Sequence, residues 1–189
     1  MLLEQRDGVR IIRVSRPEEV IPFRPSFVGA YQTIFAEFPY SERFYPSEAE
    51  SVLSRVLQTP EHIALMATRG ATGVAGFGFA LPLASRPFVA SQMQGLLPIE
   101  HTFYLAELGV LREYRNQGLG ASLIEHRLSA IDRQKYTHVV LRTSVSRDGS
   151  YALYTRLGFE DIGVYMEVPS RRTNGQVRTD RRLFLSLVL

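Results

Sequence analysis

The residues with the clearest chemical potential form the segment Arg115-Asn116-Gln117-Gly118-Leu119-Gly120, which joins a strand-like run to a helix-like run. The first turn of a helix leaves backbone N–H groups without partners, and the helix dipole adds partial positive charge there. Gly118 and Gly120 carry no β-carbon, so a phosphate can approach those amides closely, and Arg115 adds a positive charge nearby. The segment therefore predicts a pyrophosphate-binding turn. The alternative is a tight strand-to-helix turn that binds no ligand.

Two common nucleotide-binding motifs do not fit this turn. The dinucleotide fingerprint needs three glycines and a later acidic residue, whereas only Gly118 and Gly120 are present here. A P-loop needs Gly-Lys followed by Ser or Thr, which is absent from the segment. The turn alone leaves the chemical identity of its ligand open.

A second motif lies one predicted strand further along, where Leu153-Tyr154 is closely followed by Gly158-Phe159. This motif and the run from Val110 to Gly120 resemble the two sequence motifs of the GNAT N-acetyltransferase superfamily, in the family's order, over roughly residues 102–168. Arg112 replaces a proline that is common in the first motif. The asparagine and alanine that often precede the second would fall at Arg147 and Ser150, so contacts of that turn with the cofactor are not predicted.

The resemblance implies that acetyl-CoA is the cosubstrate and that it lies between two parallel strands that splay apart, here residues 102–110 and 139–145. Backbone groups near Leu108 and Val110 would pair with the pantetheine arm, and the amides from Arg115 to Ala121 would hold the pyrophosphate. The expected donor site is Leu108, Val110, Arg115, Asn116, Gln117, Gly118, Leu119, Gly120 and Ala121. The amine would attack the thioester directly in a ternary complex, without a metal.

Two residues are candidates for proton transfer. Tyr154 matches the family's tyrosine and is the expected acid for the departing thiolate; the alternative is that its ring only packs against the cofactor arm. Glu107 is the expected base, because a carboxylate inside a mostly apolar strand must face a cleft or an ion-pair partner. A structural salt bridge remains the alternative for Glu107. Some family members carry a glutamate in the next strand, but Arg142 occupies that position here.

The acceptor pocket is expected to draw on the first two helices and on residues 84–101, a long loop-like stretch. Tyr31, Phe35 and Glu42 could hold a cationic amine by cation–π and ionic contacts. The alternative is that aromatic residues at helical spacing belong to the core. The composition is closer to small-molecule acetyltransferases, so a small primary amine is the expected acceptor. A protein or peptide N-acetyltransferase, or a non-catalytic acyl-CoA-binding module, remains the alternative.

Composition sets wider bounds. The 189 residues, of which 45% are hydrophobic, predict one domain over residues 1–189. No apolar run approaches the roughly 20 residues of a membrane-spanning helix, and the N-terminus lacks the apolar region of a secretory signal, so a cytoplasmic protein that does not bind membranes is expected. There is no cysteine, and the four histidines lack the spacing of a helical metal site. The basic cluster from Arg171 to Arg182 is interpreted as solvated loop charge, and no basic stripe with stacking aromatics predicts nucleic-acid binding.

Periodicity predicts an α/β fold with a mixed, mostly antiparallel sheet, one splayed parallel strand pair and flanking helices. The expected strands are residues 9–14, 63–67, 73–83, 102–110, 139–145, 160–168 and 182–189. The expected helices run from Pro25 to about Glu37, from 46 to about 58 with Ser47 as N-cap, and over 118–131 and 150–157. The last strand is apolar on both faces, which permits a homodimer without requiring one.

Overall fold

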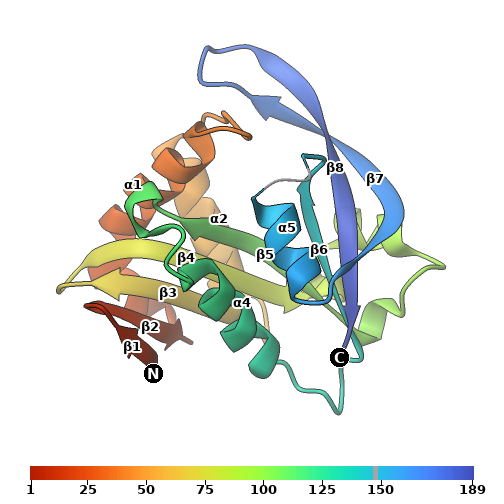
Figure 1. Cartoon of the computed structure of the whole chain (residues 1–189), viewed down its shortest axis with the longest axis horizontal. Coiled ribbons are helices and arrows are strands. Elements are labelled where there is room, and N and C mark those ends of the chain that lie inside the picture. Colours follow the sequence, from red (N-terminus) through yellow and green to blue (C-terminus); the bar gives the residue numbers. More distant parts are fainter. Residues whose placement is uncertain (147–148) are drawn as a thin grey trace.

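The computed structural model describes residues 1–146 and 149–189, which leaves Arg147 of the second motif outside the described residues. In these residues a sheet runs in the order β1-β2-β3-β4-β5-β6-β8-β7, and the one parallel pair is β5–β6 (Figure 1). The predicted α/β fold is therefore confirmed. The strands are β1 (Leu2–Arg6), β2 (Val9–Val14), β3 (Ile63–Arg69), β4 (Gly73–Pro82), β5 (Thr102–Val110), β6 (His138–Ser144), β7 (Glu160–Arg171) and β8 (Val177–Val188).

Helices cover both faces of the sheet. The longer ones are α1 (Arg24–Ala36), α2 (Pro46–Gln58), α4 (Leu119–Ser129) and α5 (Ser150–Arg156). Phe27 of α1 and Leu53 of α2 pack in one apolar core with Phe77 and Phe79 of β4. Leu123 of α4 packs in a second core, on the other face. Among the described residues no helix is long and apolar enough to cross a membrane.

The predicted elements match the structure closely, with three differences. Leu2–Arg6 forms strand β1 in a hairpin with β2, whereas its mixed charges gave no strand signal. The N-cap of α2 is Tyr45 rather than Ser47, because Tyr45 and Glu48 form reciprocal capping contacts. The stretch 84–101 is not an open loop: Val89 and Met93 are buried against the sheet in short helical turns, η2 (Leu83–Ser85), α3 (Pro87–Ala90), η3 (Ser91–Met93) and η4 (Ile99–His101).

Strands β5 and β6 pair only over their first halves. Their parallel register runs from Thr102 opposite His138 to Leu105 opposite Leu141, and the remainder of β5 has no partner on that side. Beyond Leu141, β6 continues to pair with β8. The two strands therefore separate at the middle of the sheet, as predicted for the strands 102–110 and 139–145, and Figure 1 shows them diverging behind α5.

A β-bulge in β5 decides which way Glu107 faces. Ala80 of β4 pairs with Leu105, but Phe79 pairs with Glu107, so Ala106 is an extra residue. Leu105 packs in the core beneath α4, and strict alternation would send Glu107 to the same face. The bulge instead aligns Glu107 with Phe79, whose ring packs beneath α1 and α2.

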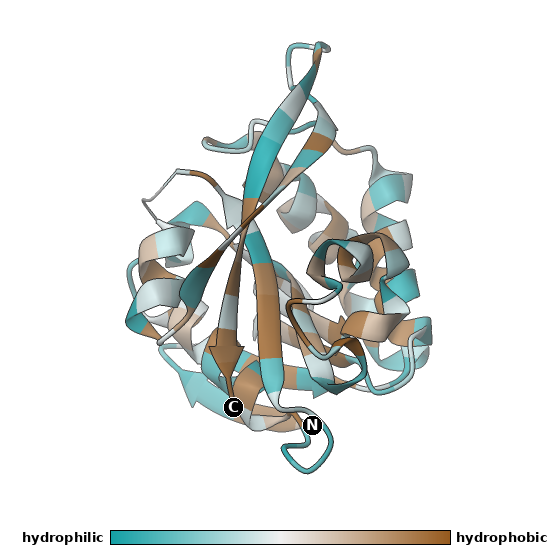
Figure 2. Ribbon diagram, turned by 90° about the vertical axis from the view of Figure 1, so that its right-hand side faces the viewer, coloured by the Kyte–Doolittle hydropathy of each residue, from teal (hydrophilic) through white to brown (hydrophobic). Residues whose placement is uncertain are grey.

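The long β7–β8 hairpin closes the structure over the splayed strands. Its tip pairs with the segment after α1: Arg43 N–H donates to the Arg171 carbonyl at 2.7 Å, and Thr173 N–H donates to the Ser41 carbonyl at 3.0 Å. Figure 2 shows a mostly hydrophilic upper hairpin and hydrophobic strands where it joins the sheet. The hairpin therefore packs against residues more than a hundred positions earlier in the chain.

Candidate active site

A cavity of about 320 Å³ lies where β5 and β6 separate. It is lined from every layer of the fold, by Tyr31, Phe35, Tyr40, Glu42, Phe44, Val52, Tyr104, Leu105, Ala106, Glu107, Leu108, Arg142, Thr143, Ser150, Tyr154, Val168, Pro169 and Arg182. The residues predicted for catalysis and for acceptor binding, Glu107, Tyr154, Tyr31, Phe35 and Glu42, all line this one cavity. No residue of 84–101 is among its lining residues, so that part of the acceptor prediction is wrong: the stretch packs in a core of its own.

The Glu107 carboxyl has an unusual acidity. Burial raises its pKa from 4.5 to about 7, because removal from water disfavours the charged form. The positive charges of Arg142 and Arg86 oppose this rise, and the negative charge of Glu42 adds to it. No described ion pair engages Glu107, so the alternative of a direct structural salt bridge does not hold within the described residues. A half-buried carboxyl with this pKa can accept a proton near neutral pH.

Tyr154 reaches the cavity from α5, on the opposite side of the sheet from α1. Its side chain is buried and makes an edge contact with the Phe159 ring, with 5.5 Å between ring centroids. Burial raises the pKa of the Tyr154 hydroxyl, and the neighbouring guanidinium of Arg127 opposes this rise. Tyr154 therefore holds its proton at neutral pH beside a fixed positive charge, which suits a proton donor.

Arg127 is a functional candidate that the sequence prediction missed. Its guanidinium is fully buried, and Nη1 donates to the carbonyls of Phe79 at 3.2 Å and Glu107 at 3.0 Å, the two residues that pair next to the bulge. Nη2 has no hydrogen-bond partner in the described structure. Arg127 is four residues after Leu123, so a charge on the apolar face of the predicted helix was the signal that could have found it.

Tyr31 and Phe35 serve both as core and as cavity wall. Both are at least nine-tenths buried, and their rings pack with 4.6 Å between centroids. Burial raises the pKa of the Tyr31 hydroxyl well above its usual value, and the nearby carboxylates of Glu107 and Glu42 add to the rise. The core interpretation of these aromatics is therefore correct, and each also presents a surface to the cavity.

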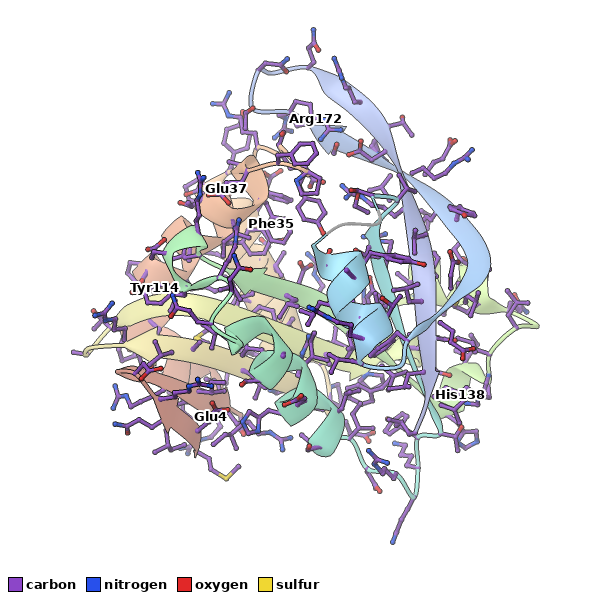
Figure 3. The ribbon with its side chains drawn as sticks, in the orientation of Figure 1. Glu4, Phe35, Glu37, Tyr114, His138 and Arg172 are labelled. Atoms are coloured by element: carbon purple, nitrogen blue, oxygen red, sulfur yellow. The ribbon has the colours of Figure 1, made fainter. Side chains whose placement is uncertain are left out.

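Glu42 does not offer a free negative charge. Its carboxylate pairs with Arg182, which also lies 3.2 Å from Asp180, and Asp180 in turn pairs with Arg172. Arg172 also donates to the Tyr40 carbonyl, and Figure 3 shows it at the hairpin above Phe35 and Glu37. The interpretation of the basic cluster as solvated loop charge was therefore wrong for Arg172 and Arg182, because folding of the hairpin pairs them with carboxylates in a largely buried network. Arg178 and Arg181 are exposed, as that interpretation expected.

The turn before α4 has the backbone expected of an anion site. Asn116 and Gly118 both have positive φ, 59° and 83°, and Gly118 is the N-cap of α4. Ser122 N–H donates to the Gly118 carbonyl at 3.0 Å, so the N–H groups of Leu119, Gly120 and Ala121 have no partner within the helix. No atom lies within 4 Å of the position that a β-carbon on Gly118 would occupy.

Side chains and strand geometry refine the other predicted donor contacts. Arg115 donates from Nε to the Val110 carbonyl at 2.9 Å and pairs with Glu37 at 2.6 Å, so its guanidinium holds the turn in place. Gln117 donates to the Glu113 carbonyl at 2.9 Å. Leu111 N–H bonds the Ala75 carbonyl of the β4 side, so alternation turns the peptide groups of Leu108 and Val110 toward the opened edge of β5. One of these groups, the Val110 carbonyl, is already occupied by Arg115.

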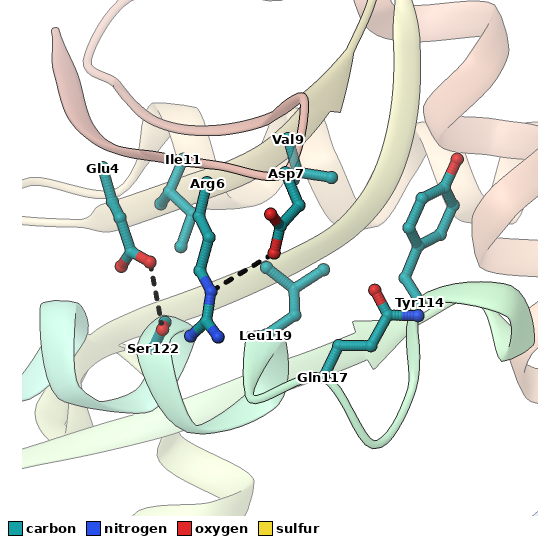
Figure 4. Close-up of a pocket in the computed structure, with 9 residues that line it drawn as sticks. All are labelled: Glu4, Arg6, Asp7, Val9, Ile11, Tyr114, Gln117, Leu119 and Ser122. Atoms are coloured by element: carbon teal, nitrogen blue, oxygen red, sulfur yellow. Dashed lines mark hydrogen bonds and ion pairs between the residues drawn. The ribbon is translucent and has the colours of Figure 1, made fainter.

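A second, much smaller hollow of about 30 Å³ lies between the β1–β2 hairpin and this turn (Figure 4). Its walls include Glu4, Arg6, Asp7 and Ser122, and Glu4 lies 3.0 Å from the His126 ring. Arg6 pairs with Asp7, and none of the predicted catalytic residues lines this hollow, so the larger cavity remains the candidate site.

Comparison with known proteins supports the interpretation of this geometry. The family model described as acetyltransferase (GNAT) family matches residues 27–159. This chain belongs to that family. The match begins within α1 and extends past α5, and so includes the splayed strands and the turn before α4.

Curated relatives in the family resemble parts of the chain. N-acetyltransferase 8F1 of Rattus norvegicus is 33% identical over 90 residues, 48% of this chain and 36% of the relative. N-alpha-acetyltransferase 30 of Schizosaccharomyces pombe (strain 972) is 34% identical over 56 residues, 30% of this chain and 37% of the relative. These matches thus span little more than a third of the relatives' lengths.

Solved GNAT structures share the fold over nearly the whole chain. Ribosomal-protein-alanine N-acetyltransferase from Brucella melitensis superimposes with a TM-score of 0.66 at 16% identity, covering 95% of this chain and 99% of that one. The ribosomal-protein-S18-alanine N-acetyltransferase from Escherichia coli gives 0.61 at 17% identity, covering 95% and 93%. At these identities the likeness establishes the fold and leaves the acceptor to be argued from the cavity.

Proposed function

We propose that this GNAT chain is an acetyl-CoA-dependent N-acetyltransferase that moves an acetyl group to a primary amine of a small molecule. The observation that carries the proposal is the meeting of Glu107 and Tyr154 in one cavity at the opening between β5 and β6. The two side chains come from opposite sides of the sheet, one with its pKa raised to about 7 and one that remains protonated. They suit opposite roles in proton transfer.

The donor is proposed to bind along the open edge of β5 and the turn before α4. The free N–H groups of Leu119, Gly120 and Ala121 suit a pyrophosphate, and the αL conformation of Gly118 directs them outward. The exposed peptide groups near Leu108 suit the amides of a pantetheine arm, which would extend the sheet as a strand does. Arg115, Asn116 and Gln117 shape the turn, and Val110 anchors it through Arg115.

The proposed reaction is direct acyl transfer. The amine nitrogen bonds to the thioester carbonyl carbon, and the carbon–sulfur bond breaks. Glu107 takes the proton that the amine loses, directly or through water, and Tyr154 gives a proton to the departing thiolate sulfur. The positive charge of Arg127 beside Tyr154 opposes the cost of forming a buried phenolate.

The wall that the β7–β8 hairpin adds to the cavity favours a small acceptor. The β7–β8 hairpin contributes Val168, Pro169 and Arg182 to its wall, and the hairpin tip is held to Ser41 and Arg43 by backbone hydrogen bonds. A protein N-terminus would have to enter past these contacts. Acetylation of protein N-termini, the activity that some relatives' names carry, is therefore an outcome to test beside the small-molecule reaction.

Release of coenzyme A thiol from acetyl-CoA tests the proposal, with a panel of small primary amines and of peptides that have free N-termini. We expect turnover with a small amine, and at least about tenfold slower turnover in Tyr154→Phe, since general acid catalysis contributes about 100-fold or more. Tyr165→Phe is the matched control, because Tyr165 is exposed on β7. Calorimetry should show unchanged acetyl-CoA affinity in both variants. Thiol release with peptides alone would replace the small-molecule acceptor, and unimpaired turnover of Tyr154→Phe would remove Tyr154 from the mechanism.

A further inference from the structure

Arg142 is a cation in the cavity wall that the proposed reaction leaves without a role. It follows Leu141, the last residue of β6 to pair with β5, so no strand covers it on that side. Its alternation along β6 places it on the face of Val140, which packs with Tyr104 and Met166, and away from the core beneath α4. The side chain therefore stands at the acceptor side of the opening.

No carboxylate within the described residues 1–146 and 149–189 lies at ion-pair distance from the Arg142 guanidinium. Within the described residues its hydrogen bond is to the Met166 sulfur at 3.2 Å, and a thioether is a weak acceptor. Arg182, the other cation in the wall, is by contrast paired with Glu42 and with Asp180. Arg142 is only partly buried and lines the cavity, so its remaining N–H groups are free to donate to a ligand there.

The charge balance of the cavity points to a ligand of negative charge. Four of its lining residues are acidic or basic: Glu42, Glu107, Arg142 and Arg182. Arg182 and Glu42 neutralise each other, and Glu107 becomes neutral when it takes the proton of an acceptor amine. Among the lining residues, Arg142 then remains as the uncompensated charge during the reaction.

Tyr104 supplies a second donor beside this cation. It lies on β5 opposite Val140, two residues before the bulge, and lines the cavity with a buried ring. Arg142 follows Val140 by two residues on the same face of β6, so it lies on the same side of the sheet as Tyr104, and both side chains line the one cavity. A guanidinium and a hydroxyl that converge on one space match the oxygens of a carboxylate.

We propose that Arg142, with Tyr104, binds a carboxylate of the acceptor, so that the small-molecule substrates of this enzyme are amino acids with a free carboxylate. This inference rests on the proposed function and narrows its substrate class. Glu107 and Arg142 stand on the two diverging strands, so one small molecule can present its amine to the first and its carboxylate to the second. The rings of Phe35 and Phe44 offer apolar contact to a side chain.

Matched ligand pairs test the proposal by binding as well as by turnover. Calorimetry with coenzyme A present compares N-acetyl-L-phenylalanine and N-acetyl-L-leucine with their C-terminal amides, which differ only in lacking the carboxylate. We expect each acid to bind wild type about tenfold or more tightly than its amide, as for hydrogen bonds to a charged group. Arg142→Gln should abolish the preference. Arg178→Gln, an exposed position on β8, should retain it.

Turnover provides the second arm, with L-phenylalanine and L-leucine against their amides as acceptors. A preference for the acids in kcat/KM that disappears in Arg142→Gln supports the inference. Equal binding of acid and amide by wild type overturns it, and so does a preference that survives in Arg142→Gln, since Arg142 then acts only on the charge of Glu107. If no amine of any kind releases thiol, the proposed function fails, and the binding comparison still tests the carboxylate site independently.

Discussion

Replacement of Glu107 by Gln tests the central feature of the site, a carboxyl whose pKa burial raises to about 7. The base is active only when ionised, so activity is lost as the pH falls through this value. With a pKa of about 7, about nine-tenths of the carboxyl is ionised at pH 8 and about one-tenth at pH 6. We therefore expect this ionisation to lower kcat/KM about tenfold between pH 8 and pH 6.

The assay is thiol release at saturating acetyl-CoA from pH 5.5 to 9, in wild type and in Glu107→Gln. Protonation of the acceptor amine affects both proteins equally, so the ratio of the two profiles isolates Glu107. We expect this ratio to rise about tenfold from pH 6 to pH 8 and then to level off. Glu125→Gln, exposed on α4, is the control and should follow wild type. A pH-independent ratio, or full activity of Glu107→Gln, would refute the role of Glu107 as base.

The same ionisation predicts a change in stability with a definite sign. Because the pKa of Glu107 is higher in the folded than in the unfolded chain, its contribution to stability is fully present below pH 4.5 and is lost as the pH rises through about 7. The full rise in the pKa of Glu107, from 4.5 to about 7, corresponds to about 3 kcal/mol of folding free energy. The carboxyl is only half-buried, so the expected effect is smaller. Between pH 4.5 and pH 8, the free energy of unfolding of wild type should fall by about 1–2 kcal/mol relative to that of Glu107→Gln, as measured by urea unfolding.

Two further substitutions test the supports of the site. Gly109→Ala would place a β-carbon 2.5 Å from the ring of buried Phe77, so we expect the free energy of unfolding in urea to fall by about 1–3 kcal/mol. The control is Gly29→Ala on α1, where no described atom lies within 4 Å and no loss of stability is expected. Equal stability of the two variants would contradict the close approach. Arg127→Met removes the donor to the carbonyls of Phe79 and Glu107. We expect kcat to fall at least tenfold while the affinity for acetyl-CoA stays unchanged, because the N-terminus of α4 lies more than a helical turn from Arg127. Turnover at the wild-type rate would show that the bulge holds Glu107 without Arg127.

Local sequence patterns were sufficient to predict most helices and strands and the glycine turn before α4. The strand 102–110, the glycines of the turn and Tyr154 on its short helix all lie where local patterns predicted them, because they depend on neighbours a few residues away. Those local patterns also carried the family resemblance, which the family match over residues 27–159 confirms. The site residues themselves stay predictions, now with defined surroundings.

What those residues face depends on long-range packing. The bulge at Ala106 turned Glu107 toward α1, and it depends on pairing with β4 and on a guanidinium from α4. Glu42 proved to be neutralised by Arg182, a partner 140 residues later in the chain. Arg142, which in the sequence only occupied a position where some family members carry a glutamate, is the one cation of the described cavity wall without a described carboxylate partner. Charge and burial depend on long-range neighbours, and neither period nor motif in the sequence records them.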